Sequence, residues 1–223
     1  YELINQKRNI IISDKEILLQ AKIGLDFSSI RYINLSVEEI FDLDQKTNSS
    51  EFTKTFIKNN PGDIPVYGAS KTEDEVGYGY ICDNAEINIS KNGKERIIKV
   101  KYFENCLTYN IDASAGYVFY RKGKFSLSEK VRPLIIRDKY NSLLDPDYLK
   151  FVLQPIFRAN IKGRRGANGE NEYTKIGKTT IKNLLIPIPI NSNNDIDLHL
   201  QREIANKYLQ IELVKLLVCK EID

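Results

Sequence analysis

The sequence predicts an α+β fold, in which a β-rich globule with short helices is followed by a long C-terminal helix. The first observation is the stretch 64–136, which is rich in Val, Ile, Tyr and Phe and broken at short intervals by Gly and Asn, as in strands joined by tight turns. The second is the stretch 198–223, where apolar residues recur at helical spacing. With 223 residues, 42% of them hydrophobic, the chain can bury one core.

The elements before residue 64 are short. Residues 13–24 predict a capped helix that ends at a glycine, and residues 30–37 alternate apolar and polar side chains as a half-buried strand does. Residues 38–43 predict about one helical turn. The polar stretch 47–60 predicts a surface loop or a short helix, and it ends at the turn signal Asn-Pro-Gly-Asp.

Later elements have clear boundaries. Asn92-Gly93 is a strong hairpin signal among the central strands. Asp145-Pro146-Asp147 predicts the start of a helix that runs from Tyr148 to Ile156 or beyond, because an acidic first turn suits the helix dipole. Residues 162–169 read as a glycine-rich basic loop. The strand predicted at 184–190 contains two prolines, which place it at a sheet edge or limit it to a few residues.

We expect three parts: a lead-in segment at 1–24, a globular domain at 25–195 and a helix at 196–223. The apolar stripe of this helix is wider than one side of a small domain needs, so we expect it to contact a partner and to be partly exposed in an isolated monomer. Its predicted partner-facing residues are Ile204, Tyr208, Ile211 and Val218. The alternative is a helix that folds back on its own globule.

The positive charge of the chain is concentrated in two stretches. The net charge is only +3, but residues 1–90 hold nine Lys/Arg against fifteen Asp/Glu. Residues 90–132 hold ten against four, and residues 150–182 hold eight against two. We expect these stretches to lie on one side of the molecule and to suit a polyanion. The alternative is a solvated surface that only keeps the protein soluble, with the aromatic residues around 117–125 in the core.

Catalytic chemistry is not indicated. His199 is the single histidine, and the three cysteines lie at irregular separations, so neither a metal site nor a Ser-His-Asp or Cys-His arrangement is predicted. The sequence has no phosphate-binding glycine loop, no Pro-Asp followed by Asp/Glu-x-Lys, and no Pro-Pro pair of an amino-methyltransferase motif. We therefore expect no enzyme activity, no metal and no cofactor.

Four motifs in order carry a family resemblance. They are Gly62-Asp63-Ile64-Pro65-Val66-Tyr67-Gly68-Ala69-Ser70, then 107–121 around Tyr109-Asn110-Ile111-Asp112-Ala113, then 148–153, and finally Leu185-Ile186-Pro187-Ile188-Pro189-Ile190 followed by Gln201-Arg202-Glu203-Ile204-Ala205. Together they resemble one target-recognition domain and helix of a type I restriction-modification specificity subunit, or the similar domain of a single-chain restriction-modification enzyme. Ala113 departs from the family, where we expect glycine.

The resemblance implies a DNA-reading module without catalysis. It would read one half of a bipartite double-stranded DNA target and position methyltransferase and, where present, restriction subunits. A full subunit resembles two such halves, and the chain contains no methionine, so we expect a fragment, a pairing half-subunit or a recognition tail. We expect a cytoplasmic protein that does not enter a membrane. The predicted DNA-facing residues are Ser70, Lys71, Lys91, Asn92, Arg121, Lys122, Lys162, Arg164, Arg165, Lys175 and Lys178.

Two other functions compete with this reading. A protein-interaction scaffold would act through the apolar C-terminal helix alone. An uncharacterised hydrolase would need a cleft of clustered carboxylates that the sequence does not indicate.

Overall fold

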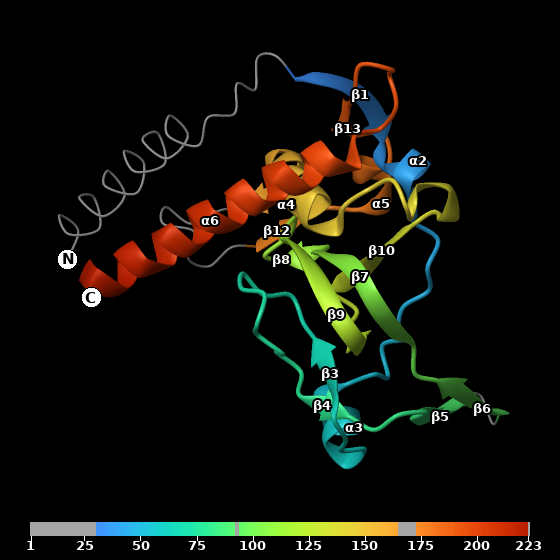
Figure 1. The fold of residues 1–223 in the computed structure, drawn as a ribbon. Helices are drawn as coiled ribbons and strands as arrows, with labels where there is room; N and C mark the ends of the chain where they lie inside the picture. The colour runs from blue at the N-terminus through green and yellow to red at the C-terminus, as the bar shows by residue number, and fades with distance from the viewer. Residues whose placement is uncertain (1–29, 92–93, 165–172, 223) are drawn as a thin grey trace.

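The computed structural model describes residues 30–91, 94–164 and 173–222, with side chains described except at 90, 91, 94 and 214–222. The helix predicted at 13–24 lies outside the described residues. Within them the fold is a strand-rich α+β domain with short helices and a long C-terminal helix, as predicted (Figure 1).

A six-stranded sheet forms the centre of the domain. Its strand order is β2-β10-β7-β9-β3-β4. Strands β7, β9 and β10 are antiparallel neighbours, whereas β3 runs parallel to β9. The bounds are β2 Phe41–Asp42, β3 Ile64–Tyr67, β4 Tyr80–Ile81, β7 Tyr102–Asn110, β9 Val118–Leu127 and β10 Val131–Ile136.

Three smaller sheets extend the domain. One pairs β1 with β13, one pairs β5 with β6, and one has the order β11-β12-β8. In Figure 1 the β1–β13 pair and the β5–β6 pair lie at opposite ends, with β8 and β12 between them. The bounds are β1 Arg31–Ser36, β5 Glu86–Lys91, β6 Lys94–Lys99, β8 Asp112–Ala113, β11 Lys162–Arg164, β12 Tyr173–Lys175 and β13 Leu185–Ile190.

Helix α4 (Pro146–Ala159) packs on the central sheet and supports the long helix. The Asp145 carboxylate accepts a hydrogen bond from the Tyr148 amide at 2.9 Å and caps the first turn, as its sequence predicts. Leu149, Leu153 and Phe157 are fully buried, and the Phe157 ring meets the ring of Tyr109 edge-on at 5.4 Å. The other helices are α2 Val37–Ile40, α3 Lys54–Asn59, α5 Lys178–Ile181 and α6 Leu198–Ile222, with a 3-10 helix at Asp138–Tyr140.

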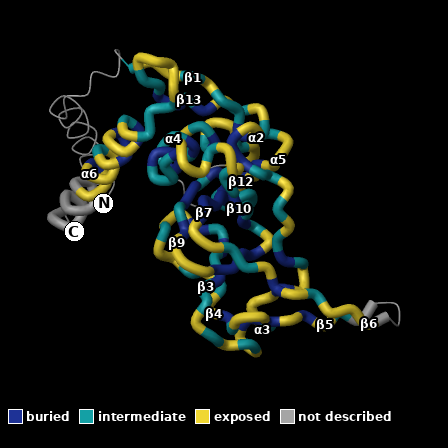
Figure 2. The backbone as a smooth tube through the Cα atoms, turned by 45° about the vertical axis from the view of Figure 1, so that its right-hand side comes forward, coloured by how far each residue is buried: buried dark blue, intermediate teal, exposed yellow. Residues whose placement is uncertain are grey.

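The largest core lies between the sheet, α4 and the start of α6. Buried residues, dark blue in Figure 2, gather where β7, β9 and β10 meet α4. A second core, around Phe52, Val66 and Ile81, holds α3, β3 and β4 at the other end of the domain. These two cores hold the ends of the central sheet in place. The domain built around them positions the exposed strands β11 and β12.

Two short stretches differ from the sequence-based expectation. Phe41 and Asp42 form a strand and not the second half of a helical turn, because Phe41 is fully buried opposite Ile136 on β10. Residues 162–164 form strand β11 and not a loop, because they pair with β12. In both places a tertiary partner overrides the local preference.

The long helix is less exposed than predicted. Ile204 and Ile211 are 3% and 8% exposed, so the expectation of partial exposure is wrong for these two residues. The first turns of α6 pack on α4, where the rings of Tyr208 and Phe151 stack at 5.2 Å. Tyr208 itself is 38% exposed, as expected, and the Val218 side chain lies outside the described residues.

Candidate nucleic-acid interface

The β11–β12 ribbon presents cationic side chains and a tyrosine on one face. In its antiparallel register, Lys162 stands opposite Lys175 and Arg164 stands opposite Tyr173. Because side chains alternate along a strand, these four point to the same side, and all four are exposed. Tyr173 is 71% exposed, which is unusual for so large a ring.

The opposite face of the ribbon is fixed to the domain. The Thr174 hydroxyl donates to the Ala113 carbonyl at 2.8 Å and accepts from the Ala115 amide at 3.0 Å, and Thr174 is fully buried. Gly163 has a φ of 119°, and a Cβ placed there would lie 2.3 Å from the Tyr173 carbonyl oxygen. Only glycine therefore allows β11 to lie this close to β12.

An arginine at the end of α4 continues this surface. Arg158 donates to the Ala115 carbonyl at 2.8 Å, and its guanidinium lies 4.5 Å from the centre of the Tyr117 ring. The rings of Tyr117 and Phe119 stack at 6.3 Å. Arg158 and Gly163 also line one depression of the surface, together with Ala159 and Ile161. The aromatic rings thus hold a cation beside the ribbon.

The β11–β12 ribbon places two like charges directly opposite each other. Like charges directly opposite each other in a sheet cost on the order of 0.2–1 kcal/mol, and Lys162 and Lys175 form such a pair. Asp112 lies opposite Lys175 on the other side and offsets part of this repulsion, since its carboxylate keeps acceptor capacity beyond the bond from the Ala113 amide. Clustered cations on a rigid ribbon suit the phosphates of a nucleic acid.

Two predicted site residues are buried, one in the loop between β3 and β4 and one on β9 that binds this loop. Ser70 is 4% exposed; its hydroxyl donates to the Glu75 carboxylate, and its carbonyl accepts from Asn110 Nδ2 at 2.6 Å. Arg121 on β9 is 3% exposed and donates to the backbone carbonyl of Glu73. Because the side chains of Ser70 and Arg121 are buried, the structure does not support direct contact of either with DNA.

Arg121 instead clamps this loop to the sheet. Its guanidinium lies 3.8 Å from the ring centre of Tyr67 and 4.6 Å from that of Phe119. Burial lowers the pKa of Arg121, but from a value so high that the side chain keeps its charge. The Glu73 carboxylate completes the clamp, accepting from the Tyr120 amide at 3.1 Å and from Lys150 Nζ at 3.0 Å.

The other predicted residues are spread over the molecule. Lys71 and Lys122 are exposed, and Lys178 on α5 forms an ion pair with Asp44. Lys91 is the last residue of β5, and its side chain lies outside the described residues, as do Asn92 and Arg165 altogether. The β5–β6 pair lies at the opposite end of the domain from α5, so these two elements do not contribute to one continuous surface (Figures 1 and 2).

Two residues of the ribbon surface were not predicted. Tyr173 belongs to it only through the pairing of β11 with β12, which no local pattern reveals. Arg158 lies four residues before Lys162, at the end of a predicted helix, and this spacing was a usable signal.

In the described ranges, no group of three or more His, Cys, Asp or Glu side chains is arranged to hold a metal ion. Cys82 and Cys106 form no disulfide, and burial raises the pKa of Cys106 to about 12. Among the described helices none is long and apolar enough to cross a membrane.

An α+β domain that fixes lysine, arginine and tyrosine side chains on one exposed ribbon has the features of a polyanion-binding module. Residues 32–213 match the family of type I restriction modification DNA specificity domains. The chain belongs to this family, whose members supply DNA specificity and not catalysis.

Similar proteins agree with this assignment. The chain is 29% identical over 130 residues to the type I restriction enzyme MpnII specificity subunit of Mycoplasma pneumoniae, covering 56% of this chain and 33% of that protein. Its fold is similar to the S subunit of a type I restriction-modification system from M. genitalium, with a TM-score of 0.53 and 18% identity over 82% of this chain and 40% of that one. It is also similar to the HsdS subunit of Thermoanaerobacter tengcongensis, with a TM-score of 0.53 and 16% identity over 99% and 49%. The chain thus spans half or less of the length of these relatives.

Proposed function

We propose that this chain reads one half of a bipartite DNA target and positions methyltransferase and, where present, restriction subunits on it. Residues 25–195 act as the recognition domain and residues 196–223 as the spacer helix. The family supports the DNA-reading role, and the cationic face of the β11–β12 ribbon carries the assignment of a binding surface. Lys162, Arg164, Tyr173 and Lys175 contact DNA directly, with Arg158 beside them.

Helix α6 supports contact with partner subunits. Tyr208, which stacks on α4, is still 38% exposed, and the helix also exposes Leu209 and Leu213, of which Leu213 is 57% exposed. Exposed apolar side chains next to each other on a helix are typical of a protein contact. The same observation supports the second function, a scaffold that acts through α6 alone.

The salt dependence of DNA binding tests the proposal. The logarithm of the affinity falls with the logarithm of the salt concentration by about 0.9 for each phosphate contact. We expect the full chain to bind a pool of random duplexes in low salt. The triple variant Lys162→Ala, Arg164→Ala, Lys175→Ala should flatten the slope by about 2.7 if each cation contacts one phosphate.

A charge-matched control separates local contacts from the loss of net charge. Lys46, Lys58 and Lys139 are exposed cations on other elements, and their triple alanine variant should change the slope much less. Equal slopes for the two variants would show that the ribbon faces away from DNA. A full chain that binds no duplex while α6 binds a protein partner would favour the scaffold.

A further inference from the structure

A small pocket lies where strand β12 leaves the β11–β12 ribbon. Its volume is about 270 Å³, and its walls include Tyr109 and Ile111 at the end of β7, Arg132 on β10, and Gly177 and Lys178 after β12. The amide of residue 176 donates to the carbonyl of residue 111 at 3.0 Å, which fixes the segment after β12 against β7. This space, here called the Tyr109 pocket, is smaller than the sites of drug-sized ligands and suits a compact group.

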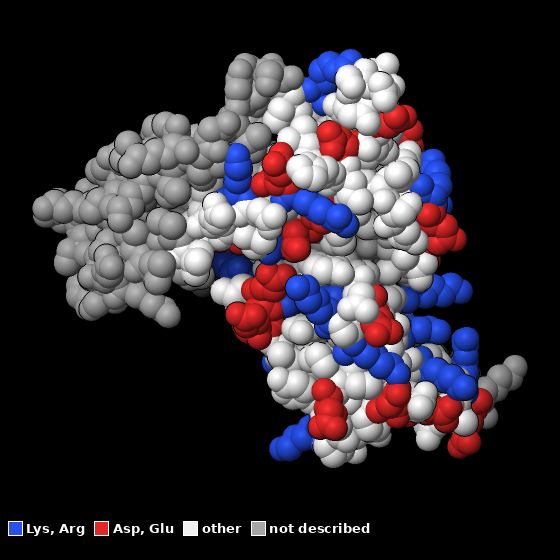
Figure 3. Space-filling model, viewed as in Figure 1, with Lys and Arg blue, Asp and Glu red and all other residues white. Residues whose placement is uncertain are grey.

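The lining of the Tyr109 pocket is cationic. Figure 3 shows Lys and Arg interspersed with Asp and Glu over the face in view, so surface charge alone singles out no site on that face. Among the described residues that line the Tyr109 pocket, Arg132 and Lys178 are cations and none is a carboxylate. A larger pocket beside β7 and β10 is instead lined by more carboxylates than cations. The Tyr109 pocket therefore suits an anion.

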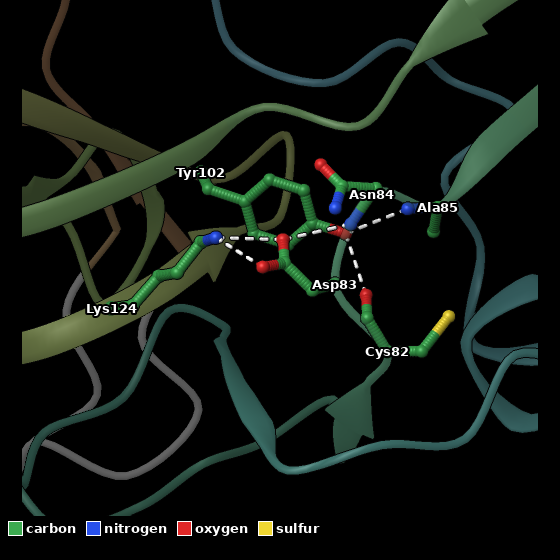
Figure 4. Close-up of polar contacts among 6 residues, drawn as sticks. All are labelled: Cys82, Asp83, Asn84, Ala85, Tyr102 and Lys124. Carbon is green, nitrogen blue, oxygen red and sulfur yellow. Dashed lines mark hydrogen bonds and ion pairs between the residues drawn. The ribbon is translucent and has the colours of Figure 1, made fainter.

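The hydroxyl of Tyr109 has no hydrogen-bond partner among the described residues. The side chain is 3% exposed, and its ring is held edge-on against Phe157. Buried phenols normally find a partner. The Tyr102 hydroxyl does so, because it donates to the Cys82 carbonyl at 2.7 Å and accepts from the Ala85 amide at 3.1 Å (Figure 4). The Tyr109 hydroxyl is thus a donor that remains available to a ligand in the pocket.

Arg132 brings a guanidinium to the same place. It stands directly opposite Tyr109 in the register of β10 and β7, so the two side chains lie on one face of the sheet. Its Nη1 donates to the carbonyls of Glu129 and Val131 at 2.8 and 2.9 Å, which holds the side chain in place. Its Nε and Nη2 donors have no acceptor among the described residues, and this side of the guanidinium can bind a phosphate.

Both groups keep the protons that an anion needs. Burial raises the pKa of Tyr109 to about 12, so the phenol is a donor at neutral pH. Burial lowers the pKa of Arg132, but from a value so high that the guanidinium stays charged. Lys178 forms an ion pair with the exposed Asp44, so it contributes less to the pocket than Arg132 does.

We propose that the Tyr109 pocket binds a phosphate group, which is held by the Tyr109 hydroxyl and the Arg132 guanidinium. The favoured source is the DNA backbone, and this part rests on the proposed function. Lys178 follows Lys175 of the ribbon by three positions, a span of at most ~10 Å, so a strand that contacts the ribbon passes close to the pocket. Contacts to phosphates set the register of a protein on a duplex, so the pocket positions the domain and does not read bases.

The variant Tyr109→Phe in the full chain tests the pocket against DNA. It removes a hydroxyl that has no described partner, so thermal unfolding should stay as in the parent chain. We expect the affinity for random duplexes in low salt to fall about tenfold, as for a lost hydrogen bond to a charged group. The salt slope should not change, because no charge is lost, whereas Arg132→Gln should flatten it by about 0.9.

Two controls match these variants at the other end of the domain. Tyr80 on β4 is 52% exposed, and Lys58 on α3 is exposed. Tyr80→Phe should leave the affinity unchanged, and Lys58→Gln should alter the slope much less than Arg132→Gln does.

Inorganic phosphate tests the same pocket without DNA. A ligand that binds the folded state raises the midpoint of thermal unfolding. At equal ionic strength, phosphate in place of chloride should raise the midpoint of the parent chain and of Tyr80→Phe. The rise should be smaller for Tyr109→Phe and Arg132→Gln, while the general effect of phosphate on protein stability is common to all four chains.

The two measurements separate the sources of the phosphate. Weaker duplex binding by Tyr109→Phe supports the DNA backbone, and a difference in phosphate alone makes a free phosphate the ligand. If Tyr109→Phe matches Tyr80→Phe in both measurements, the proposal is overturned. The proposed function still stands in that case if the ribbon triple variant flattens the slope. A parent chain that binds no duplex but shows the phosphate difference overturns the proposed function and keeps the pocket.

Discussion

Lys162 and Lys175 stand opposite each other in the register of β11 and β12, with the same charge and on the same exposed face. Such a pair weakens the ribbon, so its removal should stabilise the protein. We expect Lys162→Thr to raise the free energy of unfolding by about 0.5 kcal/mol, because one of the two like charges is removed and Thr favours strands. Urea unfolding measures this change.

The same substitution should weaken DNA binding about fivefold, as expected for the loss of a charged contact worth about 1 kcal/mol. The control Lys139→Thr should change neither quantity by a comparable amount. A less stable protein with unchanged DNA affinity would contradict the assignment of the ribbon.

Ala113→Gly should stabilise the domain. Ala113 has a φ of 65°, in the left-handed region that costs a residue with a Cβ roughly 1 kcal/mol or more. Glycine removes this cost while the hydrogen bond from Thr174 to the carbonyl of residue 113 is kept. We expect a gain of about 1 kcal/mol in urea unfolding. The control Ala159→Gly, at the end of α4, should destabilise the protein instead.

Arg121→Met should cost stability and leave DNA contacts intact. The variant removes a buried guanidinium that stacks on Tyr67 and binds the Glu73 carbonyl, a loss on the order of 2 kcal/mol. Because Arg121 is buried, the salt slope of DNA binding should stay as in the parent chain. A slope that flattens by about 0.9 with unchanged stability would instead make Arg121 a phosphate ligand.

Cys106 should resist alkylation in the folded protein. Burial raises the pKa of Cys106 to about 12, so at pH 8 about one thiol in ten thousand is ionised. The thiolate is the reactive form, and its fraction rises only as the pH approaches 12. Iodoacetamide at pH 8, followed by peptide mass spectrometry, should label Cys82 in the native protein and Cys106 only after unfolding. Equal native labelling would contradict the burial of Cys106.

Much of the fold was predictable because its signals are local. The Asp145 cap, the apolar spacing of 198–222 and the strand-rich centre each depend on neighbours in sequence, and each is confirmed. Residues 162–164 were predicted as a loop because glycine and like charges disfavour strands. The pairing with β12 that overrides this preference depends on Thr174, which is far from β8 in sequence.

The candidate site was less predictable because it depends on which way side chains face. Arg121 and Phe119 lie two residues apart on β9, so the alternation of a strand places them on one side, where the structure buries both. Tyr173 and Lys162 become neighbours only through strand register. The composition identified the cationic residues, but it could not distinguish those that stabilise the fold from those exposed on its surface.

The pairing of β1 with β13 brings residue 31 opposite residue 190. The first and last strands of the globular part therefore lie side by side, and the chain then continues into α6, whose first turns pack on α4. Such a unit can be exchanged between longer chains by joining two adjacent ends, with little cost to the host protein. Under the proposed function, recombination at this junction would change the DNA preference in a single step.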